Sequence, residues 1–139
     1  MERISKKTYY LNIAKTVAQR STCLRRNYGA VLVKDDQILS TGYNGSARGE
    51  SNCSDIEFCP REERGAKQGE HYEWCVAIHA EANAIMSAGR EARGATLYLY
   101  GQDAKTKEKI SAEPCMMCQR LIKNAGIDSV VCSLAENEL

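Results

Sequence analysis

The chain has 139 residues, of which 43% are hydrophobic and 27% are charged, and its formal net charge is +1. This length suits one domain with a sizeable core, and the near-neutral charge gives no signal for binding long nucleic acids. No apolar run reaches the ~18 residues of a membrane span, and the start lacks the apolar region of a secretory signal. We therefore expect a single domain over residues 1–139, located in the cytoplasm, with neither a polynucleotide nor a membrane as partner.

The first half of the chain is predicted to contain a helix, two strands and a long loop. Apolar residues at helical spacing predict a helix over residues 5–20. Residues 28–34 and 37–43 have the composition of two strands joined by a tight turn. Residues 44–71 are polar and rich in glycine, which predicts a loop. A loop of this length in a compact domain is usually functional or held in place by a specific contact.

The second half alternates helices and strands. Residues 73–90 carry apolar side chains at near-helical spacing, and a strand is predicted over 95–101. A helix from about Pro114 to Ala125 and a strand over 128–134 complete the chain. This order favours a partly parallel sheet with helices covering its faces, which is an α/β fold.

Cysteines are frequent for a cytoplasmic chain, with seven cysteines and two histidines in total. In a reducing compartment this indicates metal binding or catalysis rather than disulfides. Cys115 and Cys118 open the helix predicted after Pro114, one turn apart, where the helix N-terminus favours thiolates. Taken alone, this Cys-x-x-Cys pair fits a metal site and a dithiol redox site equally well.

The segment His79-Ala80-Glu81 favours the metal site. A histidine two residues before a glutamate, with Pro-Cys-x-x-Cys further along, is the signature of zinc-dependent nucleobase deaminases. One imidazole and two thiolates leave the fourth tetrahedral position of a zinc ion open for water. We therefore predict a catalytic zinc held by His79, Cys115 and Cys118, with Glu81 as the acid–base catalyst rather than a ligand.

Four segments, RSTCLRRNYGAVLV, STGYNG, HAEANAI and EPCMMCQRLIKNAGI, resemble the deoxycytidylate (dCMP) deaminase family of the cytidine-deaminase-like superfamily. The resemblance extends from about Tyr9 to Val131. It implies a three-layer α/β/α fold around a central mixed sheet of four to five strands. It also implies hydrolysis of dCMP to dUMP and ammonia, which supplies thymidylate synthesis, and places Asn44 in the nucleotide pocket. We expect a small-molecule nucleotide substrate and a homo-oligomer, either a dimer or a hexamer.

The sequence departs from that family at three places. Tyr28 stands where an aliphatic residue usually precedes Gly-Ala-Val, and the segment before Pro114 is longer than the short turn of many members. The chain also ends soon after the fourth predicted strand, so a fifth strand is expected to be minimal or missing. The longer segment weakens the assignment of the substrate by resemblance, and the short end weakens the assignment of the oligomeric interface.

A second zinc, with a structural role, is predicted at Cys23, Cys53, His71 and Cys75. His71 and Cys75 are four residues apart and would share a helical face if the helix began near His71. Four protein ligands would close the site and pin the long loop to the next helix. Some dCMP deaminases resemble this arrangement, with ligands at places similar to Cys23, Cys53 and His71. The alternatives are reduced, partly buried thiols, or Cys59 in place of Cys75.

The sequence thus predicts a zinc-dependent hydrolase that deaminates dCMP. The alternatives are a zinc deaminase of another small cytosine nucleotide, nucleoside or base, and a non-catalytic, zinc-stabilised binding module. Glu81 distinguishes an enzyme from the binding module, because a structural zinc site has no use for a carboxylate beside an open metal position. Candidates for binding the substrate phosphate are Arg25, Arg26, Arg48, Lys105 and Lys107.

Overall fold

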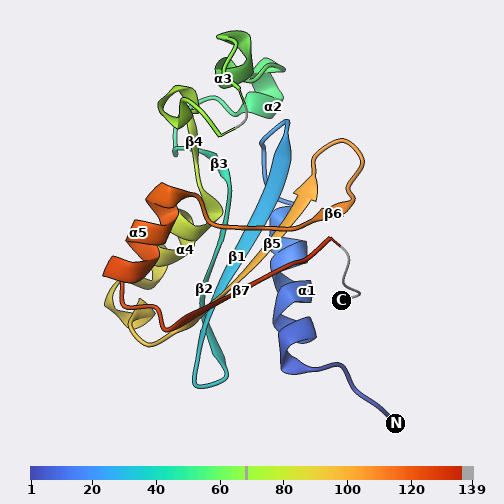
Figure 1. Cartoon of the computed structure of the whole chain (residues 1–139), viewed down its shortest axis with the longest axis vertical. Helices are drawn as coiled ribbons and strands as arrows, with labels where there is room; N and C mark the ends of the chain where they lie inside the picture. The colour runs from blue at the N-terminus through green and yellow to red at the C-terminus, as the bar shows by residue number, and fades with distance from the viewer. Residues whose placement is uncertain (68, 136–139) are drawn as a thin grey trace.

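A five-stranded sheet forms the centre of the molecule in the computed structural model, which describes residues 1–67 and 69–135. The strand order is β2-β1-β5-β6, and β7 also pairs with β5 (Figure 1). Its strands are β1 (Arg26–Lys34), β2 (Gln37–Tyr43), β5 (Thr96–Asp103), β6 (Lys109–Ile110) and β7 (Ser129–Cys132).

The sheet is mixed, as the sequence predicted. β1 is antiparallel to both β2 and β5, whereas β7 is parallel to β5. β6 lies within the 101–113 segment, where no strand was expected, and pairs antiparallel with the end of β5. It is only two residues long, so the sheet's fifth strand in the described residues is minimal.

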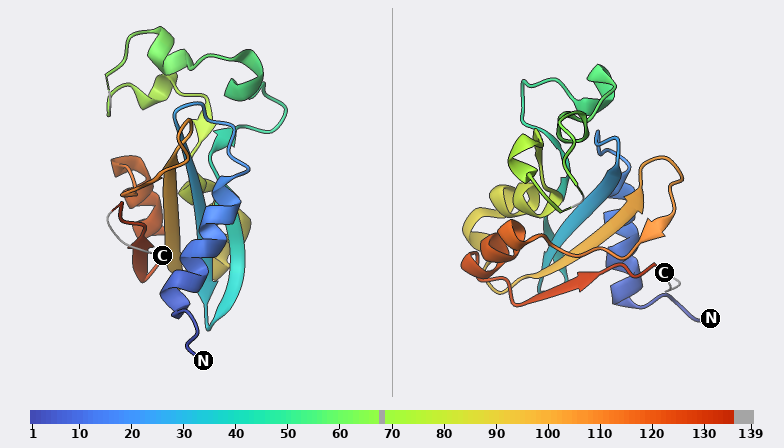
Figure 2. Two further views of the ribbon diagram at one scale, coloured as in Figure 1. Left: turned by 90° about the vertical axis from the view of Figure 1, so that its right-hand side faces the viewer. Right: turned by 45° about the horizontal axis from the view of Figure 1, so that its top comes forward.

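Helices cover both faces of the sheet and complete the predicted three layers. α1 (Lys6–Ala18) packs on one face, and α4 (Ala80–Ala88) and α5 (Met116–Asn124) pack on the other (Figure 2). The short 3₁₀ helix η2 (Gly89–Ala92) follows α4. In the described part of the chain, no helix is long and apolar enough to cross a membrane.

The alternation of side chains in β1 divides the core between the two faces. Ala30 and Leu32 pack into the cluster beneath α4 and α5, whereas Val31 and Val33 pack against α1. Gly29 lets α1 approach the strand closely, because a Cβ atom there would lie 2.0 Å from the carbonyl oxygen of Ala14. The sheet is therefore buried on both sides and forms a rigid support for the helix ends that border the site.

The segment between β2 and α4 lies beyond one end of the sheet (Figure 1). It was predicted as a loop over 44–71, which is only partly right, because it contains several short elements. Within 44–71 these are β3 (Gly45–Ser46), α2 (Cys53–Ile56) and α3 (Pro60–Glu63). The 3₁₀ helix η1 (Tyr72–Trp74) and β4 (Ala77–Ile78) follow before α4.

One predicted helix start is wrong, and another is displaced by two residues. The helix predicted over 73–90 begins only at Ala80, because Ala77 and Ile78 pair with β3 instead. His71 has a left-handed backbone with φ of 53°, so His71 and Cys75 do not share a helical face. The helix predicted from Pro114 begins at Met116, and Pro114 lies just outside it.

Candidate metal centre and substrate pocket

The first part of the site is the start of α4. His79 is the N-cap residue of this helix, with an extended backbone, and Glu81 lies in its first turn. The helix approaches β2 closely because a Cβ atom at Gly42 would lie 2.4 Å from the carbonyl oxygen of Ala80. The Asn83 side chain also donates a hydrogen bond of 2.8 Å to the carbonyl oxygen of Tyr43. Packing against the sheet therefore fixes the backbone positions of His79 and Glu81.

The second part is the start of α5, in the connection between the parallel strands β5 and β7. Cys115 is the N-cap residue, and its sulfur accepts a hydrogen bond of 3.4 Å from the backbone N–H of Cys118. The Gln119 side chain donates a bond of 2.9 Å to the carbonyl oxygen of Pro114. Both thiols therefore point from one helix N-terminus, where the backbone dipoles favour thiolate ligands.

The three predicted zinc ligands meet where these helix ends converge. The Sγ atoms of Cys115 and Cys118 each lie 3.4 Å from Nδ1 of His79. A tetrahedral zinc with ordinary Zn–N and Zn–S bond lengths separates such atoms by roughly 3.6 Å. In the described part of the chain, this is the one group of three or more His, Cys, Asp or Glu residues whose ligand atoms all lie within 4.8 Å of one another. The geometry and the donor types therefore fit a zinc ion.

Glu81 lies beside this group and is 4% exposed. Burial raises the pKa of its carboxyl group, an effect partly offset by its own backbone N–H, by His79 and by a hydrogen bond from Cys118. Burial also raises the pKa of the Cys118 thiol, as do the negative charges of Glu81 and Cys115. Such a crowd of buried anionic groups is the environment that a divalent cation stabilises.

Asn44 is buried next to the site, but its side chain is used by the protein itself. Its Oδ1 atom accepts hydrogen bonds from the backbone N–H of Tyr28 and from the Ser21 hydroxyl. Its Nδ2 atom donates a bond of 2.9 Å to the carbonyl oxygen of Arg26. Asn44 therefore fixes the start of β1 as well as lining the cavity.

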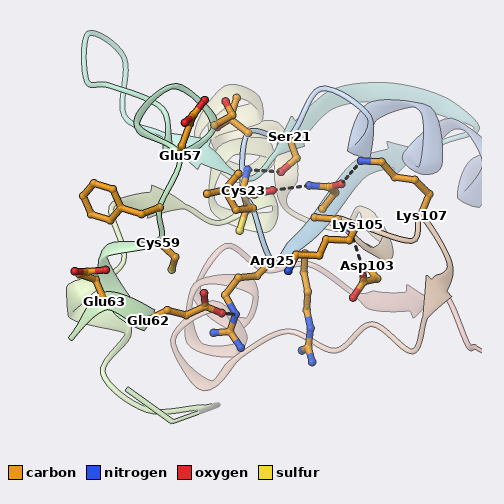
Figure 3. A pocket seen from close by; sticks show the side chains of 17 residues that line it. Ser21, Cys23, Arg25, Glu57, Cys59, Glu62, Glu63, Asp103, Lys105 and Lys107 are labelled. Carbon is orange, nitrogen blue, oxygen red and sulfur yellow. Dashed lines mark hydrogen bonds and ion pairs between the residues drawn. The ribbon is translucent and has the colours of Figure 1, made fainter. Parts of the chain in front are cut away.

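An inner cavity of about 130 Å³ leads to the metal ligands. Among its lining residues are Tyr28, Asn44, His79, Glu81 and Cys115. An outer cavity of about 880 Å³ opens beside it (Figure 3). The two cavities share Cys23, Arg25, Arg26 and Cys59.

The structure separates the five candidate phosphate-binding cations. Arg25 and Arg26 line both cavities, and Lys105 and Lys107 line only the outer one. Arg48 lines neither of these two cavities. The outer cavity also contains acidic side chains, and Arg25 forms an ion pair of 2.6 Å with Glu62. The inner end of the outer cavity is thus where cations border the space next to the metal site.

Four of the remaining cysteines influence one another electrostatically, and three of them, Cys23, Cys53 and Cys75, belong to the predicted second zinc site. The pKa of the Cys53 thiol is raised by burial and then by the negative charges of Cys23, Cys59 and Cys75. These four thiols therefore lie within electrostatic reach of one another, and three of them line the inner cavity.

The contacts of His71, which was predicted as a ligand of the second zinc, are with Glu73 and Trp74. Its Nδ1 atom is 3.0 Å from the carboxylate of Glu73, and its ring stacks on Trp74 with centroids 3.9 Å apart. Its side chain is 45% exposed. Cys59, which the sequence offered as an alternative to Cys75, acts electrostatically on both Cys53 and Cys75.

Several residues of the pocket were not predicted from the sequence. Tyr72 packs edge-on against the ring of His79 at 5.7 Å, and the guanidinium of Arg61 lies 4.5 Å from the centroid of Tyr72. Tyr28 and Glu113 also line the inner cavity. The position of Glu113 next to Pro114, and the unusual Tyr28, were signals in the sequence. No sequence signal marked Arg61 and Tyr72 as pocket residues, because their contacts depend on how the 44–78 segment folds.

Comparison with known proteins covers most of the chain. The family described as Cytidine and deoxycytidylate deaminase zinc-binding region matches residues 4–134. Deoxycytidylate deaminase of Mycobacterium phage D29 is 44% identical over 129 residues, which cover 88% of this chain and 90% of the relative. Deoxycytidylate deaminase of Schizosaccharomyces pombe is 36% identical over 124 residues, which cover 89% of this chain. The chain spans only 35% of the length of that yeast relative.

A solved structure shows the same fold. The crystal structure of dCMP deaminase from the cyanophage S-TIM5, in complex with dCMP and dUMP, matches with a TM-score of 0.65 and 26% identity. The match covers 94% of this chain and 82% of that chain. The convergent His and Cys side chains of the present structure lie within the residues matched by the family.

Proposed function

The chain belongs to the cytidine and deoxycytidylate deaminase family, and from that premise we propose that it is a zinc-dependent hydrolase that converts dCMP to dUMP and ammonia. The observation that carries this proposal is the convergence of His79, Cys115 and Cys118 beside the buried carboxyl group of Glu81. The names of the phage and yeast relatives support dCMP as the substrate. The product dUMP would supply thymidylate synthesis.

The size of the inner cavity supports a pyrimidine ring as the group next to the metal site. Its volume is about 130 Å³, of the same order as the ~150 Å³ cavity that holds a benzene molecule in another protein. A whole nucleotide does not fit there. The base would therefore enter the inner cavity, and the sugar and phosphate would extend toward the outer cavity and its cations.

Glu81 is the group that moves protons in the proposed reaction. A bound zinc would supply Lewis-acid activation of a water molecule. Glu81 accepts a proton from the attacking water and passes it to N3 of cytosine as the water oxygen bonds to C4. Glu81 then transfers the second proton of that water to the 4-amino group, the C4–N bond breaks, and ammonia leaves. One water molecule thereby replaces the amino group by a carbonyl oxygen.

A substrate panel tests the proposal. Ammonia release is measured with dCMP, CMP, deoxycytidine, dCTP and cytosine, using protein purified with zinc. We expect dCMP to exceed deoxycytidine in kcat/KM by at least ~10-fold, because charge-assisted bonds to a phosphate contribute ~1.4 kcal/mol or more. Equal values for these two compounds would overturn dCMP as the substrate and favour a nucleoside deaminase. Zinc-loaded protein without activity on any compound would favour the binding module.

A second, structural zinc is also proposed, held by the thiols of Cys23, Cys53, Cys59 and Cys75. Their mutual electrostatic effects support this set, with His71 as the alternative to Cys59 that the sequence favoured. Four thiolates are a common ligand set for a closed structural zinc. Such a site would connect the end of the first helix to the segment that leads into His79.

We further propose that residues 1–139 act as one deaminase domain and that copies of it form a homo-oligomer, a dimer or a hexamer. The α4–α5 side of the molecule supports the assembly, because it exposes large apolar side chains that water solvates poorly. They are Met86, Met116, Met117 and Leu121. Light scattering after size-exclusion chromatography measures the mass, and a monomer at micromolar concentration would contradict the assembly.

A further inference from the structure

The side chain of Tyr28 forms part of the inner cavity because of the register of the sheet. Alternate residues of a strand face the same side, so Arg26 and Tyr28 share the side of Ala30, which packs beneath α4. Tyr28 pairs directly with Gly101 of β5. A Cβ atom at Gly101 would lie 2.7 Å from Cε1 of the Tyr28 ring. The ring therefore lies against the bare backbone of β5 and forms a fixed wall of the cavity.

The hydroxyl group of Tyr28 connects the wall to the charged groups of the site. The Arg26 side chain, two positions away on the same side of β1, is within hydrogen-bonding reach of it, and the Glu81 carboxyl is near enough to act on it electrostatically. Burial raises the pKa of Tyr28, so the phenol remains neutral at physiological pH. A neutral phenol oxygen can accept a bond from Arg26 without cancelling the charge of the guanidinium.

Arg26 lies where the inner and outer cavities meet, since it lines both. A nucleotide with its base in the inner cavity would bring its phosphate to this junction. Arg25, which also lies there, is engaged by Glu62 at 2.6 Å. The ammonium of Lys107, further out, donates a bond of 3.3 Å to Asn27 (Figure 3). A guanidinium binds phosphate best when its planar fork is oriented, so what orients Arg26 matters.

We propose that Tyr28 is a specificity-determining residue, whose ring walls the space for the base and sugar and whose hydroxyl directs the Arg26 guanidinium toward the 5′-phosphate of the substrate. This inference rests on the proposed function, because it requires a ligand whose base occupies the inner cavity. Tyr28 acts on the phosphate through Arg26 and is in that respect a positioning residue. Discrimination between dCMP and deoxycytidine would therefore depend on a phenol that makes no contact with the phosphate.

The variant Tyr28→Phe tests this, because it keeps the ring over Gly101 and removes only the hydroxyl. We expect the ratio of kcat/KM for dCMP to kcat/KM for deoxycytidine to fall about 10-fold, the size of one lost hydrogen bond to a charged group. The change should appear in KM for dCMP. The matched control is Tyr98→Phe, which removes a phenol hydroxyl from the opposite face of the sheet, where Tyr98 packs with Tyr10, and should leave the ratio unchanged.

A double-mutant cycle with Arg26→Gln identifies the path. In the Arg26→Gln background, Tyr28→Phe should lower the ratio by less than a further 2-fold. The effects are not additive because the two side chains act together, and the loss of Arg26 already removes their joint effect. Calorimetric titration with dUMP and deoxyuridine gives the same comparison without catalysis. A wild-type preference for the phosphorylated ligand that Tyr28→Phe leaves unchanged overturns this inference alone, as does an equal loss for both substrates. No such preference in the wild type overturns both the inference and the proposed function.

Discussion

The two cysteine groups of this protein differ in what holds their thiols in place. Cys115 and Cys118 lie at the start of α5, and the facing His79 caps α4, so two helices packed on the sheet bring the ligand atoms within 4.8 Å. Cys53 and Cys59 lie in or beside very short helices beyond the end of the sheet. No three thiols of the second group, all described residues, lie within 4.8 Å of one another.

The difference shows that rigid packing can order one site of a protein while another site depends on ligand binding. Apolar burial against the sheet can preorganise the first group, because α4 and α5 have a core beneath them. The 44–78 segment has few buried apolar side chains, and ordering each residue costs ~1–2 kcal/mol of conformational entropy. Polar contacts of its described residues, such as those of Arg61, and the proposed second zinc would supply its order.

Glu81→Gln should give the largest change in activity and leave the metal content unchanged. Loss of proton transfer is expected to lower kcat for dCMP by at least ~100-fold, while His79, Cys115 and Cys118 retain zinc. Ammonia release and metal analysis by mass spectrometry check both parts. Glu91→Gln, on the exposed surface after α4, is the matched control. A variant that loses the catalytic zinc would identify Glu81 as a ligand instead.

Cys59→Ser should affect the second group without disturbing the first. We expect the zinc content to fall from two ions to one per chain and the free energy of unfolding to decrease. Zinc at a free concentration of 100 times its dissociation constant contributes about 2.7 kcal/mol to the free energy of unfolding. Metal analysis and denaturant titration make the measurement.

His71→Gln is the matched comparison for Cys59→Ser, because it removes the ligand that the sequence alone favoured. Zinc content should remain at two per chain, and stability should change by no more than ~0.5 kcal/mol, as for an exposed side chain. Loss of one zinc in His71→Gln but not in Cys59→Ser would restore the original ligand set. One zinc per wild-type chain would exclude the second site altogether.

Arg61→Gln should loosen the 44–78 segment by a smaller amount. The Arg61 guanidinium is buried and donates bonds of 2.6 Å and 2.8 Å to the carbonyl oxygens of Glu70 and Lys67. Loss of such charge-assisted bonds is expected to cost ~1.5–3 kcal/mol. Limited proteolysis should then cut within this segment sooner than in the wild type. Arg48→Gln, exposed in the same segment, should leave the cleavage rate unchanged.

Tyr10→Phe should have the smallest effect and is confined to the face of the sheet away from the site. The Tyr10 hydroxyl donates a hydrogen bond to the Asp36 carboxylate, and its loss should lower the free energy of unfolding by about 1 kcal/mol. Zinc content and deaminase activity should stay at wild-type values. A fall in activity above ~2-fold would show that α1 influences the catalytic face, contrary to the separation of the two core clusters.

The sequence by itself determined the fold class and the candidate metal ligands, because both depend on local patterns. The apolar runs at 30–33 and 95–100 are typical of strands buried on both faces, and a histidine and two cysteines at helix starts are donors whose type and spacing suit zinc. The start of α4 was misplaced because Ala77 and Ile78 pair with β3, a contact that helical periodicity does not reveal.

Only the tertiary structure decided which side chains share the pocket. His71 adopts a left-handed backbone and its ring stacks on Trp74, an arrangement that the predicted helical face did not include. Tyr28 enters the cavity because the register of β1 and β5 places it opposite Gly101, the residue that leaves space for its ring. The position of Tyr28 depends on contacts between segments far apart in the chain, and such contacts form only when the sheet packs together.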